Sequence, residues 1–158
     1  MPSRVAAAHR TAAVVGGAAV LFLCGCSIPR WPIEGRLTSP YGLRFRGISP
    51  DVHPGVDIAA PSGTPVRAMK NGRVTFAGTM QGYGITVILE HGPGMRTLYG
   101  HLSEAHVRAG DEVRGRDVIG LVGATGNATA PHLHFEVRRW GRQEDPVPLL
   151  GGMPGNGN

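Results

Sequence analysis

Short alternating segments separated by single glycines constrain this chain most strongly. Between Leu37 and Val137, polar and apolar residues alternate within brief runs rich in Val, Ile and Leu. A period of two is that of a strand with one buried face, whereas an amphipathic helix needs a period of 3.6. The segments predicted as strands are Pro65–Met69, Gly72–Ala77, Ile85–Glu90, Arg96–Tyr99, Asp117–Val122 and His132–Arg138. The sequence therefore predicts a mainly β fold, a single small antiparallel domain.

Two local expectations accompany this fold. Leu102–Val107 is the segment best suited to a short helical turn. The stretch VRAGDEVRGRDVIG predicts a hairpin whose Val113 and Val118 face the core.

Glycine and proline number 25 and 13 among 158 residues, but they are spread singly as turn residues, which excludes a collagen-like repeat, a coiled coil or a helical bundle. The net charge of +5 includes no block of like charges, so we expect no nucleic-acid partner.

The N-terminus has the pattern of an export signal. Arg4 and Arg10 precede an uncharged, apolar run that is shorter than a membrane span and ends at Cys26. Leu23, Gly25 and Cys26 resemble a bacterial lipobox, in which the cysteine receives lipid. The resemblance implies a signal peptide over residues 1–25 and a membrane anchor on Cys26. An uncleaved anchor, or a redox pair of Cys24 and Cys26, remains the alternative.

The rest of the chain divides into three parts by composition. Residues 26–36 contain the lipidated cysteine and a proline-containing segment without helical period, which we interpret as an extended tether. Residues 37–148 form the domain. Residues 149–158 have the sequence LLGGMPGNGN and are expected to be a disordered tail. Ser27 after the lipidated cysteine favours the outer membrane in a bacterium that has one.

The histidines carry the most specific chemical pattern. His53 and Asp57 are four residues apart with Pro54 and Gly55 between them, and an even spacing in extended chain places both side chains on one face. His132 and His134 share a strand face for the same reason. Imidazole nitrogens with one carboxylate suit zinc, which in catalytic sites has three protein ligands and an open fourth position. The spacing leaves open which of His132 and His134 is a ligand. A single histidine in a β protein is usually only hydrogen-bonded, so the prediction depends on the combined pattern.

The order and spacing of several motifs resemble the lysostaphin-like, LytM-type zinc peptidases of bacterial cell walls. The resemblance covers about residues 37–146. The motifs that carry it include SPYGLR at 39–44, HPGVDIAAPSGT at 53–64, YGHLS at 99–103 and PHLHFEV at 131–137. It implies a β fold with a metal-floored groove, in which His53, Asp57 and His134 bind one zinc ion and His101 and His132 are catalytic. Ala130 stands where the family has glycine, which would narrow one groove wall.

The resemblance implies a membrane-anchored zinc endopeptidase of the bacterial cell envelope that hydrolyses peptide cross-links in peptidoglycan. No HExxH motif is present, so a thermolysin-type site is excluded. Glu136 shares the face of His134 and is either a partner of that imidazole or a groove-edge carboxylate. The alternatives are a non-catalytic LytM-type protein that binds wall or activates a separate amidase, and a structural metal-binding lipoprotein. Activators of this kind have lost ligands or catalytic histidines, whereas all five positions are present here. The sequence identifies no regulatory protein partner.

Overall fold

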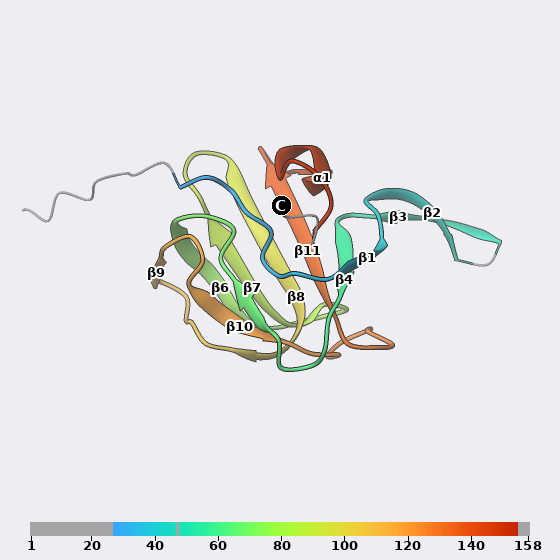
Figure 1. Cartoon of the computed structure of the whole chain (residues 1–158), viewed down its shortest axis with the longest axis horizontal. Helices are drawn as coiled ribbons and strands as arrows, with labels where there is room; N and C mark the ends of the chain where they lie inside the picture. Colours follow the sequence, from blue (N-terminus) through green and yellow to red (C-terminus); the bar gives the residue numbers. More distant parts are fainter. Residues whose placement is uncertain (1–26, 47, 155–158) are drawn as a thin grey trace, which may run out of the picture.

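The computed structural model describes residues 27–46 and 48–154, so the expected signal peptide and Cys26 lie outside the described residues. Within them the chain forms twelve strands and one short helix (Figure 1). Among these residues no helix has the length and apolarity needed to cross a bilayer.

A ten-stranded antiparallel sheet forms the body of the domain. Its main path runs in the order β1 (Arg36–Ser39), β4 (Val56–Ala59), β11 (His132–Arg139), β8 (Met95–Ala105), β7 (Gly84–Glu90), β6 (Gly72–Met80) and β9 (Glu112–Val113). Off this path, β10 (Val118–Val122) pairs with β5 (Pro65–Arg67) and β8, and β12 (Arg142–Glu144) pairs with β11. A separate hairpin of β2 (Gly42–Arg46) and β3 (Ser49–His53) projects from the β4 side of the body (Figure 1). The predicted mainly β, antiparallel fold class is confirmed.

Alternation along β11 divides its side chains between the core and the candidate site. Leu133, Phe135 and Val137 are completely buried in the apolar core. His134 and Glu136, which point to the opposite face, are buried as well. Burial on both faces explains why this strand contains few exposed residues until Arg139.

Two local expectations were wrong. The segment from Leu102 is not a helical turn, because β8 continues to Ala105 and pairs there with Gly120 of β10. The expected hairpin does not form either, since β9 pairs with β6 while β10 pairs with β5 and β8. The carboxylates of Asp111 and Asp117 each accept a backbone N–H three residues earlier, at 2.8 Å, and so form two separate turns. Val113 is buried as predicted, and Val118 is half-buried.

The segment expected to be an extended tether is packed against the domain from Ser27 onward. The Trp31 indole donates a hydrogen bond to the Gly152 carbonyl at 2.9 Å and meets Phe135 edge to face. The Pro32 carbonyl accepts the N–H of Arg67, and Ile33 is 5% exposed within the core. The buried apolar surface of Trp31 and Ile33 offsets the entropy of fixing a segment without regular structure.

The tail expected to be disordered from residue 149 is also packed, over residues 149–154. The helix α1 (Pro146–Leu149) begins at Asp145, whose side chain accepts the N–H of Val147. Leu149 and Leu150 then pack against the core, and Pro154 is buried. Leu149 and Leu150 give this segment an apolar contact with the core, and the Gly152 carbonyl accepts the hydrogen bond from Trp31. The high glycine content of the segment had led to the prediction of disorder.

Candidate active site

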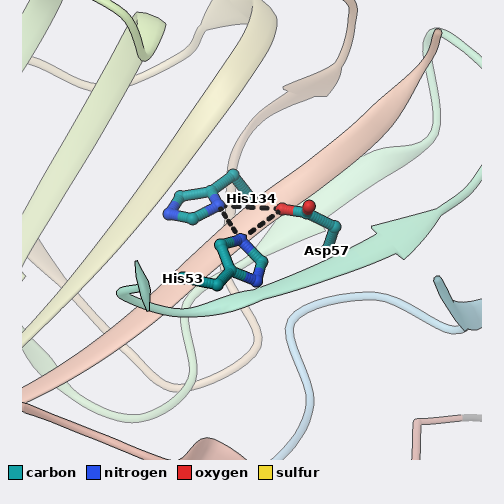
Figure 2. A group of neighbouring side chains, drawn as sticks. All are labelled: His53, Asp57 and His134. Carbon is teal, nitrogen blue, oxygen red and sulfur yellow. Dashed lines mark hydrogen bonds and ion pairs between the residues drawn. The ribbon is translucent and has the colours of Figure 1, made fainter. Parts of the chain in front are cut away.

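Three strands bring His53, Asp57 and His134 together (Figure 2). The β4–β11 register places Asp57 directly opposite His134, and His53 is the last residue of β3. Oδ1 of Asp57 lies 2.8 Å from Nδ1 of His134 and 3.1 Å from Nε2 of His53. The two ring nitrogens are 3.2 Å apart. One donor atom from each residue thus converges on a single point.

The outer nitrogens of the two rings have acceptors, which fixes the tautomers. Nδ1 of His53 lies 2.8 Å from the Pro40 carbonyl, and Nε2 of His134 lies 3.1 Å from Oε1 of Glu136. A proton on each of these nitrogens leaves Nε2 of His53 and Nδ1 of His134 as lone pairs that face the Asp57 carboxylate. Three electron-rich atoms directed at one point repel one another unless a cation lies between them. The donor set therefore fits a divalent metal such as zinc.

The pKa shifts agree with a cluster that attracts positive charge. Burial would raise the pKa of Asp57, but the facing nitrogens of His134 and His53, which would donate to this carboxylate when protonated, hold the pKa well below its ordinary value. Burial would lower the pKa of His134, but Asp57 and Glu136 raise it. Both carboxylates stabilise a positive charge at the centre of the group.

Glu136 is a buried partner of His134 and not a groove-edge carboxylate. Its side chain is 0% exposed. Oε1 accepts the Tyr83 hydroxyl at 2.8 Å, and Oε2 accepts Nε of Arg138 at 2.7 Å. Burial opposes ionisation, yet the bonds from His134, Tyr83 and Arg138 lower the pKa of Glu136, while burial and Glu136 raise the pKa of Tyr83 to about 12. Tyr83 was not predicted from the sequence. It follows Gly82 in a turn, and no sequence spacing relates this turn to Glu136 on β11.

His101 and His132 lie side by side next to this group, with ring centroids 4.7 Å apart. Nδ1 of His101 donates to the Thr125 carbonyl at 2.8 Å, and Nδ1 of His132 donates to the Ala130 carbonyl at 2.8 Å. These backbone bonds leave Nε2 of each ring for chemistry in the pocket. Burial lowers the pKa of His101, and the neighbouring imidazoles lower it further, so this ring is neutral near pH 7.

Backbone strain accompanies the position of His101. Its φ of 60° lies in the left-handed region, and its N–H donates to the Tyr83 carbonyl at 2.7 Å. A non-glycine residue in that region costs free energy and is common at functional sites. The bonds to Tyr83 and Thr125 hold His101 in this conformation.

A pocket of about 350 Å³ contains all five predicted side chains. Arg44 forms part of the pocket wall, with its Nη1 3.6 Å from Oδ2 of Asp57 and its Nε 3.1 Å from Oδ2 of Asp51. Sequence reasoning had assigned no role to Arg44 beyond its place in SPYGLR. The complete lining is Arg44, His53, Pro54, Asp57, Gly82, Tyr83, His101, Asn127, Thr129, His132 and His134. Ala130, expected to narrow the wall, does not line the pocket.

Comparison with known families identifies the domain. The profile described as Peptidase family M23 matches residues 51–146, which is more than half of the chain. The chain belongs to this family. Solved structures similar to this M23 domain include a putative peptidase M23 from Pseudomonas aeruginosa, with a TM-score of 0.71 and 36% identity over 80% of this chain and 51% of that one. A zinc-containing peptidase from Vibrio cholerae has a TM-score of 0.72 and 32% identity over 80% of this chain and 40% of that one.

Curated relatives of the M23 domain have two kinds of name. The DD-carboxypeptidase/endopeptidase Mpg of Neisseria meningitidis is 49% identical over 114 residues, 71% of this chain and 26% of that protein. The murein hydrolase activator EnvC of Escherichia coli is 40% identical over 132 residues, 80% of this chain and 31% of that protein. The matched segment is thus between a quarter and a third of the length of these relatives.

Proposed function

We propose that this chain is a lipid-anchored, zinc-dependent endopeptidase that hydrolyses peptide cross-links in bacterial peptidoglycan. His53, Asp57 and His134 would hold one zinc ion, and His101 and His132 would act on the reacting groups. The observation that carries the proposal is the convergence of all five side chains on one open pocket. Relatives named as endopeptidases and as murein hydrolase activators support peptidoglycan as the substrate.

The histidines beside the metal group suit general acid–base chemistry. Bound zinc would polarise the scissile carbonyl and favour ionisation of the attacking water. Neutral His101, held through Nδ1 by Thr125, can accept a proton at Nε2. His132, held in the same way by Ala130, presents Nε2 to the same pocket. A ring that has gained a proton can donate it to the developing oxyanion or to the leaving amine.

A second candidate function is activation of a separate amidase. The 40% identity to a murein hydrolase activator favours it. Retention of both catalytic histidines and of all three candidate ligands supports hydrolysis instead, because an activator needs neither. An activator would accelerate an added amidase and would release no product alone.

Lipidation of Cys26 is the proposed means of anchoring. Removal of residues 1–25 would leave the acylated cysteine directly before Ser27, and the protein would face the wall from the outer membrane where the host has one. Mass spectrometry of the full chain purified from membranes tests this directly, since a Cys26 without lipid contradicts the anchor and leaves the hydrolase unaffected.

Digestion of defined muropeptides tests the activity. We expect the zinc-loaded chain to release products identifiable by mass and to lose activity with a chelator. Asp57→Ala and His134→Ala should reduce zinc content and activity together, whereas His106→Ala, at an exposed histidine, should change neither. Full zinc occupancy in the Asp57→Ala/His134→Ala double variant would refute the ligand assignment. A zinc-loaded chain that cleaves nothing alone but accelerates an amidase would favour the activator.

A further inference from the structure

The chain enters its domain at a corner formed by Ser27, Asn71 and Gly115, which we call the Ser27 corner. Oγ of Ser27 accepts the N–H of Asn71 at 2.9 Å, and Oδ1 of Asn71 accepts the N–H of Gly115 at 2.8 Å. The N–H of Arg30 donates to the Met69 carbonyl at 3.1 Å. These bonds fix the first described residues to the body, so a group attached to residue 26 would be held beside this corner.

Five basic residues lie within three positions along the chain of the residues that form the Ser27 corner. Lys70 precedes Asn71, and Arg114 and Arg116 flank Gly115. The remaining two are Arg30 and Arg73. All four arginines are exposed, and Lys70 is partly exposed. Such a cluster near the point where the chain enters the domain differs from isolated surface charges, because its position relative to the N-terminus is fixed.

The acidic side chains near the corner do not neutralise this cluster. Glu112 lies 3.8 Å from Arg73, and Glu90, opposite Arg73 on β7, pairs with Arg96. Asp117 uses its carboxylate to accept the backbone N–H of Arg114. Within residues 27–46 and 48–154, the charged groups of Arg30, Lys70, Arg114 and Arg116 have no acidic side chain within 4 Å. The five basic side chains exceed the two carboxylates of the same segments, Glu112 and Asp117, so the corner carries an excess of positive charge.

An apolar side chain lies in the same place. Ile28, which follows Ser27 directly, is 76% exposed, although Ile33 only five residues later is buried in the core. An exposed isoleucine among arginines and a lysine is the composition of surfaces that bind at the boundary of headgroups and acyl chains.

We infer that the Ser27 corner is a membrane-docking face, whose basic side chains contact anionic phospholipid headgroups and whose Ile28 reaches the acyl boundary. The inference rests on the proposed lipid at Cys26. One extended residue spans only about 3.3–3.6 Å, so a lipid on Cys26 would leave no free tether before the docked Ser27. The corner must then lie at the headgroups, where negative surface potential attracts Lys and Arg.

This docking orients the candidate active site away from the membrane. The Ser27 corner lies where β6 begins and β9 ends, whereas the candidate metal group lies on β3, β4 and β11. In the sheet order β9 and β11 are separated by four strand spacings, which correspond to about 19 Å along the sheet. Figure 1 shows the start of the N-terminal segment and the β2–β3 hairpin on opposite sides of the body. The fixed corner would thus direct the pocket toward the wall without a long tether.

Hydrogen–deuterium exchange of the reconstituted full chain tests the docking. The chain purified from membranes is placed in vesicles of phosphatidylcholine alone or of phosphatidylcholine with phosphatidylglycerol. We expect backbone amides of residues 70–73 and 112–117 to exchange several-fold more slowly in the anionic vesicles, and high salt to remove the difference. Lys70→Glu/Arg114→Glu should abolish it. Arg139→Glu/Arg142→Glu, with the same change of charge on β11 and β12, should retain it.

The outcomes separate this inference from the proposed function. Equal exchange in both vesicles, from a chain that carries lipid and digests muropeptides, overturns the docking alone. Slower exchange only when peptidoglycan is added would assign the basic cluster to wall polymer and also overturns it. A chain without lipid on Cys26 contradicts the anchor and removes the reason for the corner to lie at the membrane. Retained digestion by Lys70→Glu/Arg114→Glu shows that the substitutions leave the fold intact.

Discussion

Glu136 and His134 point to the same face of β11, and Oε1 of Glu136 lies 3.1 Å from Nε2 of His134. The carboxylate is fully buried and is also bonded to Tyr83 and Arg138. The imidazole of His134 therefore cannot rotate without leaving a buried charged group short of a partner. This arrangement orients Nδ1 of His134 toward Asp57 and makes that nitrogen more basic, which suits the metal-ligand role proposed for His134.

Glu136→Gln should weaken zinc binding by about 10–100-fold, because a neutral amide polarises His134 less and retains Arg138 poorly. Competition with a chromophoric chelator measures the affinity. Glu144→Gln is the matched control, since Glu144 is an exposed carboxylate paired with Arg139 on the neighbouring strand. Unchanged affinity in Glu136→Gln would show that His134 is oriented by packing alone.

His132→Ala and His101→Asn should retain zinc while the rate of muropeptide cleavage falls by roughly 10²-fold or more. Asparagine is preferred at position 101 because it tolerates the left-handed backbone better than alanine. Zinc content by elemental analysis and the cleavage rate are measured on the same samples. If either variant loses its zinc, the corresponding histidine is a ligand and the division of roles must be changed.

Six of the twelve strands could be predicted from the sequence because each contains its own alternation, whereas β1, β2, β3, β4, β9 and β12 were not predicted. The predicted segments correspond to β5, β6, β7, β8, β10 and β11, with ends that differ by up to three residues except at β8, which continues to Ala105 instead of ending at Tyr99. Packing of the N-terminal segment could not be predicted in this way. The Trp31 indole donates its hydrogen bond to Gly152, which is 121 residues away, and a local hydrophobic period cannot predict such a contact.

The candidate site, like the fold, could be predicted from the sequence only where the signal is local. Even spacing predicts that His53 and Asp57, or His132 and His134, share a face. Only the β4–β11 register reveals that Nδ1 of His134 is 2.8 Å from Oδ1 of Asp57, whereas Nε2 of His132 is 3.7 Å from it. The supporting contacts of Tyr83 and Thr125 come from turns that are distant in sequence, so they required the folded arrangement.

Ile33→Ala should lower the free energy of unfolding by about 2–5 kcal/mol, the range for deleting a buried isoleucine side chain. Ile28→Ala is the matched control and should change it by less than about 0.5 kcal/mol, because Ile28 is 76% exposed. Urea unfolding followed by circular dichroism measures both. Equal stability of the two variants would mean that residues 27–35 are not part of the cooperative core.

His91 provides a pH-dependent contribution to stability away from the candidate site. Its Nδ1 donates to the Asn71 carbonyl at 2.8 Å, and its Nε2 lies 2.7 Å from the Thr97 hydroxyl. That hydroxyl is 3.0 Å from the buried Tyr99 hydroxyl, which accepts the N–H of Met69. The Thr97 hydroxyl donates to Tyr99, and burial of the His91 ring disfavours its protonated form.

Protonation of His91 would place a positive charge on a partly buried ring near Lys70. Burial accordingly lowers the pKa of His91 from its ordinary value of 6.5, and the nearby Lys70 lowers it further. Because the unfolded chain then binds a proton at higher pH than the folded chain, the free energy of unfolding falls as the pH drops below about 6.5. His91→Gln removes this titration, so its stability difference from the unsubstituted protein should shrink as the pH falls from 7 toward 5. His106→Gln, at an exposed histidine, should leave the pH dependence as it is, and urea unfolding at a series of pH values compares the three proteins. A difference between His91→Gln and the unsubstituted protein that stays constant across this range would mean that His91 binds its proton equally well in both states.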